Sequence, residues 1–583
     1  MRHFTEVRDS LKIEWDAPIV MNDGVTLRCD IFRPNDDKKY PVILSYGPYG
    51  KSHLTSEGYA KSWGMLLNAY PEVMEGTSGK YLSWEVVDPE IWVPWGYICL
   101  RIDSRGAGNS EGILDLLSAR ETQDIYDCIE WVAEQQWCDG KVAMSGISYF
   151  GTNQWAVGAL CPPHLSACII WEGGLDYYRE YARHGGILSD MCKYWPDKRI
   201  FPLQHGNGDR GYKNRITGEN GTGNKTLHPY ELQKMHVNSL AFNLEHEMFD
   251  EKMQSRKPDI SKMTVPLFST ANWGGAPLHP RGNYEGFIDA GSNEKFLEVH
   301  GDMHWGHYYT KYGITLQKQF LDYYVKGIDT GWNKRPGRVQ LQVRHIDKFV
   351  ERFEDDWPIP RAQWQKWYLT PSNGLTLDSA APDTAKETYN AAGDGLTFLS
   401  EPFEQEAEFT GPMASKLFVS SESMDADIFL VLRLFAPDMT EVTFQGANDP
   451  KSPIGMGWLR ASHRELDAEK TLPYRPYHTH AKKELLEPGK VYELDIEIQP
   501  TGIVVPAGYR IGLSVRGKDY VWGGYKHKLD PVYPLRIPVD TGVHEFTHTD
   551  ADDRPFEIFG KDVTLYFGDD MQPYLMLPYI PEK

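Results

Sequence analysis

Between residues 25 and 326, short runs of β-branched and aromatic residues alternate with segments of helical periodicity. This alternation is typical of a mostly parallel β-sheet whose strands are joined by crossover helices. Ile125, Ile129 and Val132 recur at i, i+4 and i+7, which turns one apolar stripe of a helix toward such a sheet. We therefore expect seven strands, at residues 25–32, 42–46, 97–102, 141–145, 165–171, 265–272 and 295–300.

Two stretches depart from this rhythm and divide the chain. Residues 173–262 are rich in Tyr and Arg and then in Gly and Asn, which predicts a helical insertion over one edge of the sheet. After residue 357 come short alternating runs broken by Pro and Gly, the pattern of an all-β sandwich or jelly roll. We expect one α/β domain from residues 1–172 and 263–345, a helical cap at 173–262 and a jelly-roll β-sandwich at 357–583. A length of 583 residues agrees with more than one folded unit.

Charge and cysteine content narrow the partners and the compartment. The net charge of −21 repels phosphate backbones and anionic lipids, so we expect neither nucleic acid nor a membrane as partner. Seven cysteines, none in a CxxC pair and none after Cys192, favour reduced thiols and a cytoplasmic protein. The first residues lack the apolar core of a signal peptide.

The most specific local pattern is Gly146-Ile-Ser148-Tyr-Phe-Gly151, which lies where a predicted strand passes into a predicted helix. A tight turn between small residues lifts its central side chain above the sheet, beside the start of a helix. Ser148 is therefore the candidate nucleophile. The alternative is an ordinary glycine-rich turn, since GxSxxG alone is a weak signal.

Acyl chemistry at such a serine also needs hydrogen-bond donors for the oxyanion. The backbone amide of Tyr149, at the head of the helix, is one candidate. The phenol of Tyr49, in the loop after an earlier strand, is the second. The alternative for Tyr49 is a half-buried turn tyrosine with a purely structural role.

A general base is expected after the last strand of the sheet, where His300, His304 and His307 follow one another. We choose His304, four residues past the strand end, with His307 in reserve. The same H-x3-H-x2-H spacing could also form a zinc site, but no cysteine or HExxH motif accompanies it.

Taken with the elbow around Ser148, several further motifs resemble the cocaine esterase family, which includes α-amino acid ester hydrolases, glutaryl acylases and X-prolyl dipeptidyl peptidases. They include Gly47-Pro-Tyr-Gly-Lys51, Asp103-Ser-Arg-Gly-Ala-Gly-Asn-Ser110 and, near the C-terminus, Pro506-Ala-Gly-Tyr-Arg-Ile-Gly-Leu513. The resemblance implies an α/β-hydrolase domain with a helical cap and a C-terminal jelly roll. It also implies a Ser-acid-His triad working through an acyl-enzyme, with Ser148 as nucleophile, His304 as base and Tyr49 and Tyr149 as oxyanion donors.

The chain departs from this family at the acid. The family carries its catalytic Asp soon after the strand at 265–272, where this chain reads Asn272-Trp-Gly-Gly-Ala276. A triad acid only has to reach the outer nitrogen of the histidine, so a neighbouring strand can supply it. We propose Glu172, directly after the strand at 165–171; the alternative is that Glu172 caps a helix starting at Leu175. Asp176 and Asp302 are weaker candidates.

The resulting expectation is a serine hydrolase that cleaves a carboxylic ester, or an amide, of a small molecule without cofactor or metal. Aromatic residues of the insertion (Trp171, Tyr177, Tyr178, Trp195) would line its pocket, with Arg179, Arg183 and His184 as polar selectors, unless they serve as core. Alternatives are an X-prolyl dipeptidyl-peptidase or amide acylase of the same family, transfer of the acyl group to an acceptor other than water, and a non-catalytic carbohydrate-binding protein. A homo-oligomer is compatible with the sequence, which leaves the oligomeric state open.

Three further patterns are interpreted as structural. Gly206-Asn-Gly-Asp-Arg-Gly211 matches a dinucleotide motif, but no strand precedes it, so a loop is expected. A structural role is expected for the turn at Asp103 and Arg105, because the family that the chain resembles uses this turn to organise the sheet edge. His478 and His480 are expected on the surface.

Overall fold

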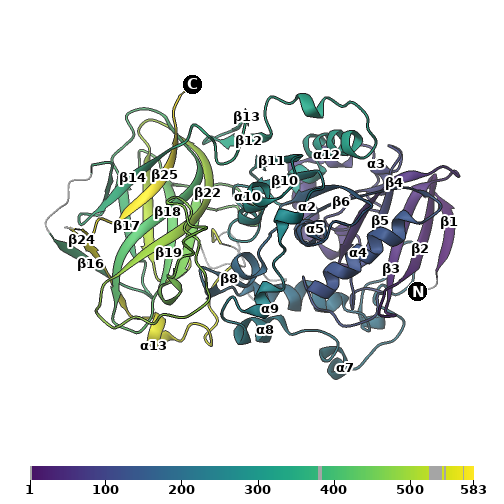
Figure 1. The fold of residues 1–583 in the computed structure, drawn as a ribbon, viewed down its shortest axis with the longest axis horizontal. Coiled ribbons are helices and arrows are strands. Elements are labelled where there is room, and N and C mark those ends of the chain that lie inside the picture. The colour runs from purple at the N-terminus through teal and green to yellow at the C-terminus, as the bar shows by residue number, and fades with distance from the viewer. Residues whose placement is uncertain (1–2, 379–383, 524–540, 544–545, 569, 583) are drawn as a thin grey trace.

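The computed structural model describes residues 3–378, 384–523, 541–543, 546–568 and 570–582. Its N-terminal part is built on a twisted sheet (Figure 1). All seven predicted strands are present, and those from β4 onward pair in parallel. In spatial order the sheet runs β3 (Thr26–Pro34), β5 (Ile98–Asp103), β4 (Tyr40–Gly47), β6 (Cys138–Ile147), β7 (Leu165–Trp171), β10 (Leu267–Asn272), β11 (Lys295–His300) and β12 (Val339–Arg344).

Three antiparallel strands extend this sheet beyond the prediction. β1 (Phe4–Arg8) and β2 (Leu11–Val20) continue it past β3, and β13 (Phe349–Glu354) pairs with β12 at the other end. β3 itself runs antiparallel to its neighbour β5. The sheet is therefore mixed at its edges and parallel in its centre.

Helices cover both faces of the sheet because successive side chains of each buried strand point to opposite faces and are apolar on both. In β4, Val42 and Leu44 join the core beneath α4 (Ala119–Ala133) and α5 (Tyr149–Ala159). Ile43, between them, joins the opposite core beneath α12 (Lys311–Tyr324). Shorter helices complete this part: α1 (Thr55–Gly58), α2 (Ala60–Ala69), α3 (Pro89–Trp92), α10 (Pro280–Asp289) and α11 (Gly306–Tyr309).

The segment between β7 and β10 is made of short elements. They are η2 (Tyr177–Ala182), the two-stranded pair β8 (Arg183–His184) and β9 (Ile187–Leu188), α6 (Met191–Trp195), η3 (Pro196–Ile200), η4 (Phe201–Leu203), η5 (Gly208–Arg210), α7 (Pro229–Gln233), α8 (Ser239–Glu245), α9 (Glu251–Gln254) and η6 (Ile260–Lys262). The glycine motif at 206–211 lies in this segment within a loop and a single 3₁₀ turn, as expected.

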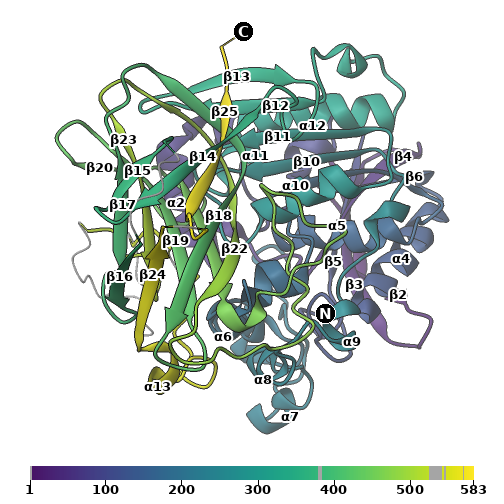
Figure 2. The same ribbon diagram turned by 60° about the vertical axis from the view of Figure 1, so that its left-hand side comes forward.

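The C-terminal strands pair in a closed circuit that encloses its own hydrophobic core, and they lie beside the N-terminal sheet in both views (Figures 1 and 2). The circuit passes through β18, β22, β21, β19, β23, β17, β15, β14 and β25, and returns to β18. The strands are β14 (Gln363–Thr370), β15 (Gly374–Thr376), β16 (Ala385–Asn390), β17 (Leu396–Ser400), β18 (Ala407–Ser421), β19 (Asp427–Phe435), β20 (Glu441–Val442), β21 (Gly455–Arg460), β22 (Tyr492–Val505), β23 (Arg510–Arg516), β24 (Asp562–Phe567) and β25 (Tyr574–Ile580), with one short helix, α13 (Phe556–Phe559).

Two predictions about single residues can be compared with this structure. Asp103 forms a buried ion pair with Lys51, and Arg105 pairs with Asp124, which confirms a structural role for that turn. The prediction that His478 and His480 lie on the surface is wrong, because both are buried. They lie in a long connection that folds back against the segment between β7 and β10, a contact that local sequence does not reveal.

A buried ionic cluster joins the segment between β7 and β10 to the C-terminal strands. Arg183 of β8 donates to Asp553 at 2.6 Å, and Arg460 of β21 donates to the same carboxylate at 2.8 Å and to Asp427 at 2.8 Å. Burial would raise the pKa of Asp553, but the two guanidinium groups hold it well below its usual value. Among the residues described, no helix is long and apolar enough to cross a membrane, and all seven cysteines are free thiols.

We expect Asp553→Asn to destabilise the protein strongly, because it leaves two buried arginines with too little negative charge. Breaking a buried ion pair from one side lowers the free energy of unfolding by about 3–5 kcal/mol. Asp394→Asn is the control, since its carboxylate is 94% exposed beside Arg516 and such pairs contribute roughly 0–1 kcal/mol. Urea unfolding followed by circular dichroism measures both; equal losses would contradict a structural role for the cluster.

Candidate active site

Ser148 occupies a strained turn between β6 and α5. Its backbone has φ +59° and ψ −115°, a conformation that non-glycine residues rarely adopt. A Cβ on Gly146 would come within 2.3 Å of Phe150, and one on Gly151 within 2.9 Å of the Trp171 carbonyl oxygen, so both neighbours must be glycine. The Ser148 amide donates to the Trp171 carbonyl at 2.9 Å, which ties the turn to the end of β7. The serine is thus held at the carboxyl edge of the parallel strands.

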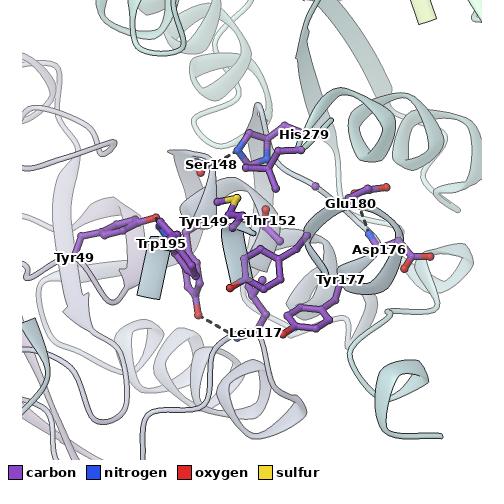
Figure 3. A pocket seen from close by; sticks show the side chains of 14 residues that line it. Tyr49, Leu117, Ser148, Tyr149, Thr152, Asp176, Tyr177, Glu180, Trp195 and His279 are labelled. Carbon is purple, nitrogen blue, oxygen red and sulfur yellow. Dashed lines mark hydrogen bonds between the residues drawn. The ribbon is translucent and has the colours of Figure 1, made fainter. Parts of the chain in front are cut away.

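The serine lies in the wall of a pocket (Figure 3). Its walls are largely apolar and aromatic: Leu117, Tyr149, Tyr177, Tyr181, Met191, Trp195 and Leu278. Of the four aromatic residues expected there, Tyr177 and Trp195 line the pocket, whereas Trp171 and Tyr178 are fully buried in hydrophobic cores.

The three expected polar selectors make structural contacts. Arg179 pairs with Asp176 at 2.8 Å, and Arg183 belongs to the ionic cluster with Asp553. His184 hydrogen-bonds to His548 at 2.7 Å. None of these three side chains lines the pocket at Ser148.

Tyr49 and Tyr149 both line this pocket. The Tyr49 hydroxyl accepts a hydrogen bond from Trp195 Nε1 at 3.2 Å (Figure 3). Burial raises the pKa of Tyr49 well above its usual value, so the phenol keeps its proton and remains a donor. Tyr149 is the first residue of α5, where a backbone amide has no acceptor within the helix.

Glu172 follows β7 directly and its side chain is fully buried. Its Oε2 accepts a hydrogen bond from Nδ1 of His304 at 2.6 Å. Its Oε1 accepts from His300 Nε2 at 3.0 Å and from Asn272 Nδ2 at 3.2 Å. The capping alternative does not hold, because the helix that follows, η2, is capped by the side chain of Asp176.

The charges of this cluster stabilise one another. Burial would raise the pKa of Glu172, but the charge of His304 and hydrogen bonds from His300 and His304 hold it well below its usual value. Burial likewise opposes protonation of His304, yet Glu172 and a second carboxylate raise its pKa to about 10. His300, buried between Glu298 and Glu172, has its pKa raised to about 9.

The second carboxylate is Glu85, a residue that no sequence motif singles out. Its Oε1 lies 3.3 Å from Nε2 of His304, so the imidazole is flanked by carboxylates on both nitrogens. Its Oε2 is buried without a hydrogen-bond partner among the described residues. Burial raises the pKa of Glu85, and the hydrogen bond with His304 opposes that rise.

The Ser148 hydroxyl hydrogen-bonds to His279, with 3.1 Å between Oγ and Nε2 (Figure 3). His304 lies beside this imidazole, with the two rings nearly parallel and their centroids 5.4 Å apart. The structure therefore brings the predicted Glu172 and His304 together and sets an unpredicted histidine against the serine. His279 lies in the loop after β10, at the carboxyl edge where functional groups gather, and that position was the available signal.

The remaining candidates have other contacts. His307 packs against His300, with ring centroids 5.0 Å apart, and burial lowers its pKa to about 4. Asp302 contacts the hydroxyl of Tyr70. Within the described part of the chain no group of His, Cys, Asp and Glu side chains is arranged to hold a metal ion, and His300 and His304 bind Glu172 instead.

Comparisons with known proteins identify the family of this chain. Residues 23–345 match the X-Pro dipeptidyl-peptidase (S15) family, and residues 330–532 match the C-terminal non-catalytic domain of the X-Pro dipeptidyl-peptidases. Cocaine esterase from Rhodococcus sp. (strain MB1 Bresler) is 23% identical over 86% of this chain and 90% of its own length.

Solved structures show the same similarity. A CocE/NonD family hydrolase from Staphylococcus aureus superposes with a TM-score of 0.83 at 30% identity, covering 100% of this chain and 96% of its own. An α-amino acid ester hydrolase shares the fold, with a TM-score of 0.64 at 16% identity over 97% of this chain and 96% of its own. This chain has the CocE/NonD-type hydrolase fold with a C-terminal non-catalytic domain, belongs to the S15 family and is a serine hydrolase.

Proposed function

We propose that this protein hydrolyses carboxylic esters of small molecules through an acyl-enzyme, with Ser148 as nucleophile, His304 as base and Glu172 as the triad acid. The observation that carries this proposal is the 2.6 Å hydrogen bond from His304 to the buried carboxylate of Glu172, at the same sheet edge as the strained serine. The chain order of serine, acid and histidine is the order of the α/β-hydrolases.

In this mechanism the Ser148 oxygen attacks the carbonyl carbon of the substrate as its proton passes to Nε2 of His304, the nitrogen that lies 3.3 Å from Glu85 in the structure. Glu172 holds Nδ1–H and stabilises the imidazolium that forms. The Tyr49 hydroxyl and the Tyr149 amide are proposed to donate to the oxyanion of the tetrahedral intermediate. His304 then gives its proton to the leaving group, and a water molecule, activated by the same imidazole, releases the acid.

The largely apolar wall of the pocket favours an apolar or aryl acyl group. We further propose that residues 173–262 act as the cap that supplies part of this wall, and that residues 357–583 form the jelly roll beside the α/β domain of residues 1–172 and 263–345. A cytoplasmic location is proposed from the seven free thiols.

A second candidate substrate is an ester or amide with a free amino group. Asp176 and Glu180 line the same pocket, and both are buried. Burial, with the neighbouring charge of Asp176, raises the pKa of Glu180 to about 7 despite the charge of Arg281. These carboxylates pair with Arg179 and Arg281, and a cationic amine would share them with those arginines. X-Pro dipeptidyl-peptidases and an α-amino acid ester hydrolase are among the similar proteins.

The triad is tested with Ser148→Ala and Glu172→Gln. We expect Ser148→Ala to abolish covalent labelling by a fluorophosphonate, which needs an activated serine. Glu172→Gln keeps the shape of the acid but not its charge, and should lower kcat on an aryl ester by roughly 10⁴-fold. Near-parental kcat in Glu172→Gln would exclude Glu172 as the triad acid, and labelling of Ser148→Ala would exclude the serine.

Glu85 should set the pH at which the base becomes active. His304 must be neutral to accept a proton, so kcat/KM falls as the pH drops below the raised pKa of His304. Glu85→Gln removes one of the two carboxylates that raise this pKa, so the acid limb should move to lower pH. The control is Glu298→Gln, which contacts His300 instead and should move the limb less. An unmoved limb in Glu85→Gln would mean that Glu85 does not act on the base.

The two substrate candidates differ in their need for an amine. We expect phenyl esters of small apolar acids to be hydrolysed with a higher kcat/KM than esters and amides that carry a free amino group. If the site recognises an amine instead, aminoacyl esters and aminoacyl-proline anilides should be hydrolysed with a higher kcat/KM than their N-acetylated forms. Glu180→Gln should then remove this difference in kcat/KM. A kcat/KM that is indifferent to acetylation would eliminate the second candidate.

A further inference from the structure

His279 is the group in contact with the nucleophile, yet it is not part of the proposed triad. It lies at the start of α10 in the loop after β10, and only 5% of the residue is exposed. Its Nε2 is 3.1 Å from Oγ of Ser148, and both residues line the same pocket (Figure 3). Any change in the charge of the Ser148 oxygen during the reaction therefore takes place within hydrogen-bond distance of the His279 imidazole.

The surroundings of His279 determine which nitrogen carries its proton. Nδ1 is buried and has no hydrogen-bond partner among the described residues. A proton on Nδ1 would leave a buried N–H donor unsatisfied, which is rarer in proteins than an unsatisfied acceptor. The favoured tautomer therefore carries its proton on Nε2, where the N–H donates to the Ser148 oxygen.

The groups around His279 also keep it neutral. The ring of His304 is stacked against it, so a charged His279 would face a like charge once His304 has taken the serine proton. The His279 ring also lies at the N-terminus of α10, where the helix dipole disfavours a cation. Of the acids nearby, Glu172 is committed to His300 and His304, Asp176 to Arg179 and Glu180 to Arg281. Burial and the charge of His304 lower the pKa of His279 to about 3.

We propose that His279 is a further catalytic residue, a neutral hydrogen-bond donor whose Nε2–H stabilises the developing negative charge on Ser148 Oγ. This inference rests on the proposed function, in which His304 is the base. During attack the Oγ–H bond breaks, its proton goes to Nε2 of His304, and an electron pair of Oγ forms the new bond to the acyl carbon. When the acyl-enzyme is hydrolysed, the Oγ–acyl bond breaks and Oγ regains a proton from His304. His279 keeps its own proton throughout.

A hydrogen-bond donor and a general base at position 279 can be distinguished with variants. His279→Leu removes the donor, whereas the amide of His279→Gln can still donate to Ser148. His307→Leu is the matched control: this histidine also has a buried Nδ1 without a partner, but it does not line the pocket. Each variant is measured as full-length protein by its fluorophosphonate labelling rate and by kcat/KM on a phenyl ester from pH 5 to about 10.5, with near-UV circular dichroism to check folding.

We expect His279→Leu to lower both rates by roughly 10²-fold, the loss typical of a donor to a charge formed in the transition state. His279→Gln should recover most of this loss, and the acid limb, which reports His304, should persist in both variants. Parental rates in His279→Leu, a loss in His279→Gln equal to that in His279→Leu, or disappearance of the acid limb would each overturn the inference. A wild-type protein labelled no faster than Ser148→Ala would instead refute the proposed function.

Discussion

The buried carboxylate of Glu172 is the interaction on which the site depends. Removing a carboxylate from water carries a penalty of several kcal/mol, so it needs partners that offset the lost hydration. Here the partners are Asn272 and His300, from the ends of β10 and β11, and His304 from the loop beyond. Glu172 itself follows β7. One charge thus fixes the ends of three adjacent strands and orients the imidazole proposed as base.

Backbone strain gathers around the same charge. Ser148, Glu172, Glu85 and Asp302 all have positive φ, a conformation that non-glycine residues adopt at a cost of about 1–3 kcal/mol each. The Ser148 amide donates to the carbonyls of Trp171 and Glu172, so the strained serine turn and the acid are supported by one backbone segment. The hydrogen bonds of the Glu172 carboxylate help to hold these unusual conformations in place.

The strands of the central sheet could be located in the sequence because each of them is marked by its own local residues. Each of the seven strands is a short apolar run, and the two glycines around Ser148 leave room for a turn that other residues would block. Glu172 could be proposed because a missing acid at the end of β10 left few carboxylates at neighbouring strand ends. Its contact with His304 agrees with that reasoning.

What escaped prediction depends on contacts between distant segments. Glu85 reaches His304 from a loop more than two hundred positions earlier in the chain, and His279 meets Ser148 only because β10 pairs beside β7. His478 and His480 were wrongly assigned to the surface because the segment that covers them lies some three hundred residues away. Local periodicity carries no information about such pairings, whereas it does determine which residues face a core.

The cluster of Arg183, Asp553 and Arg460 has a consequence for selectivity. Several residues of the segment that carries Arg183 also line the cavity at Ser148. Buried ion pairs through Asp553 attach this segment to Arg460 of the C-terminal strands. If this segment moved away from the cavity, the buried ion pairs of Asp553 would have to separate or become exposed to water. If the acyl group binds in this cavity as proposed, only groups that fit its present shape should be accepted, because the C-terminal strands hold this wall in place.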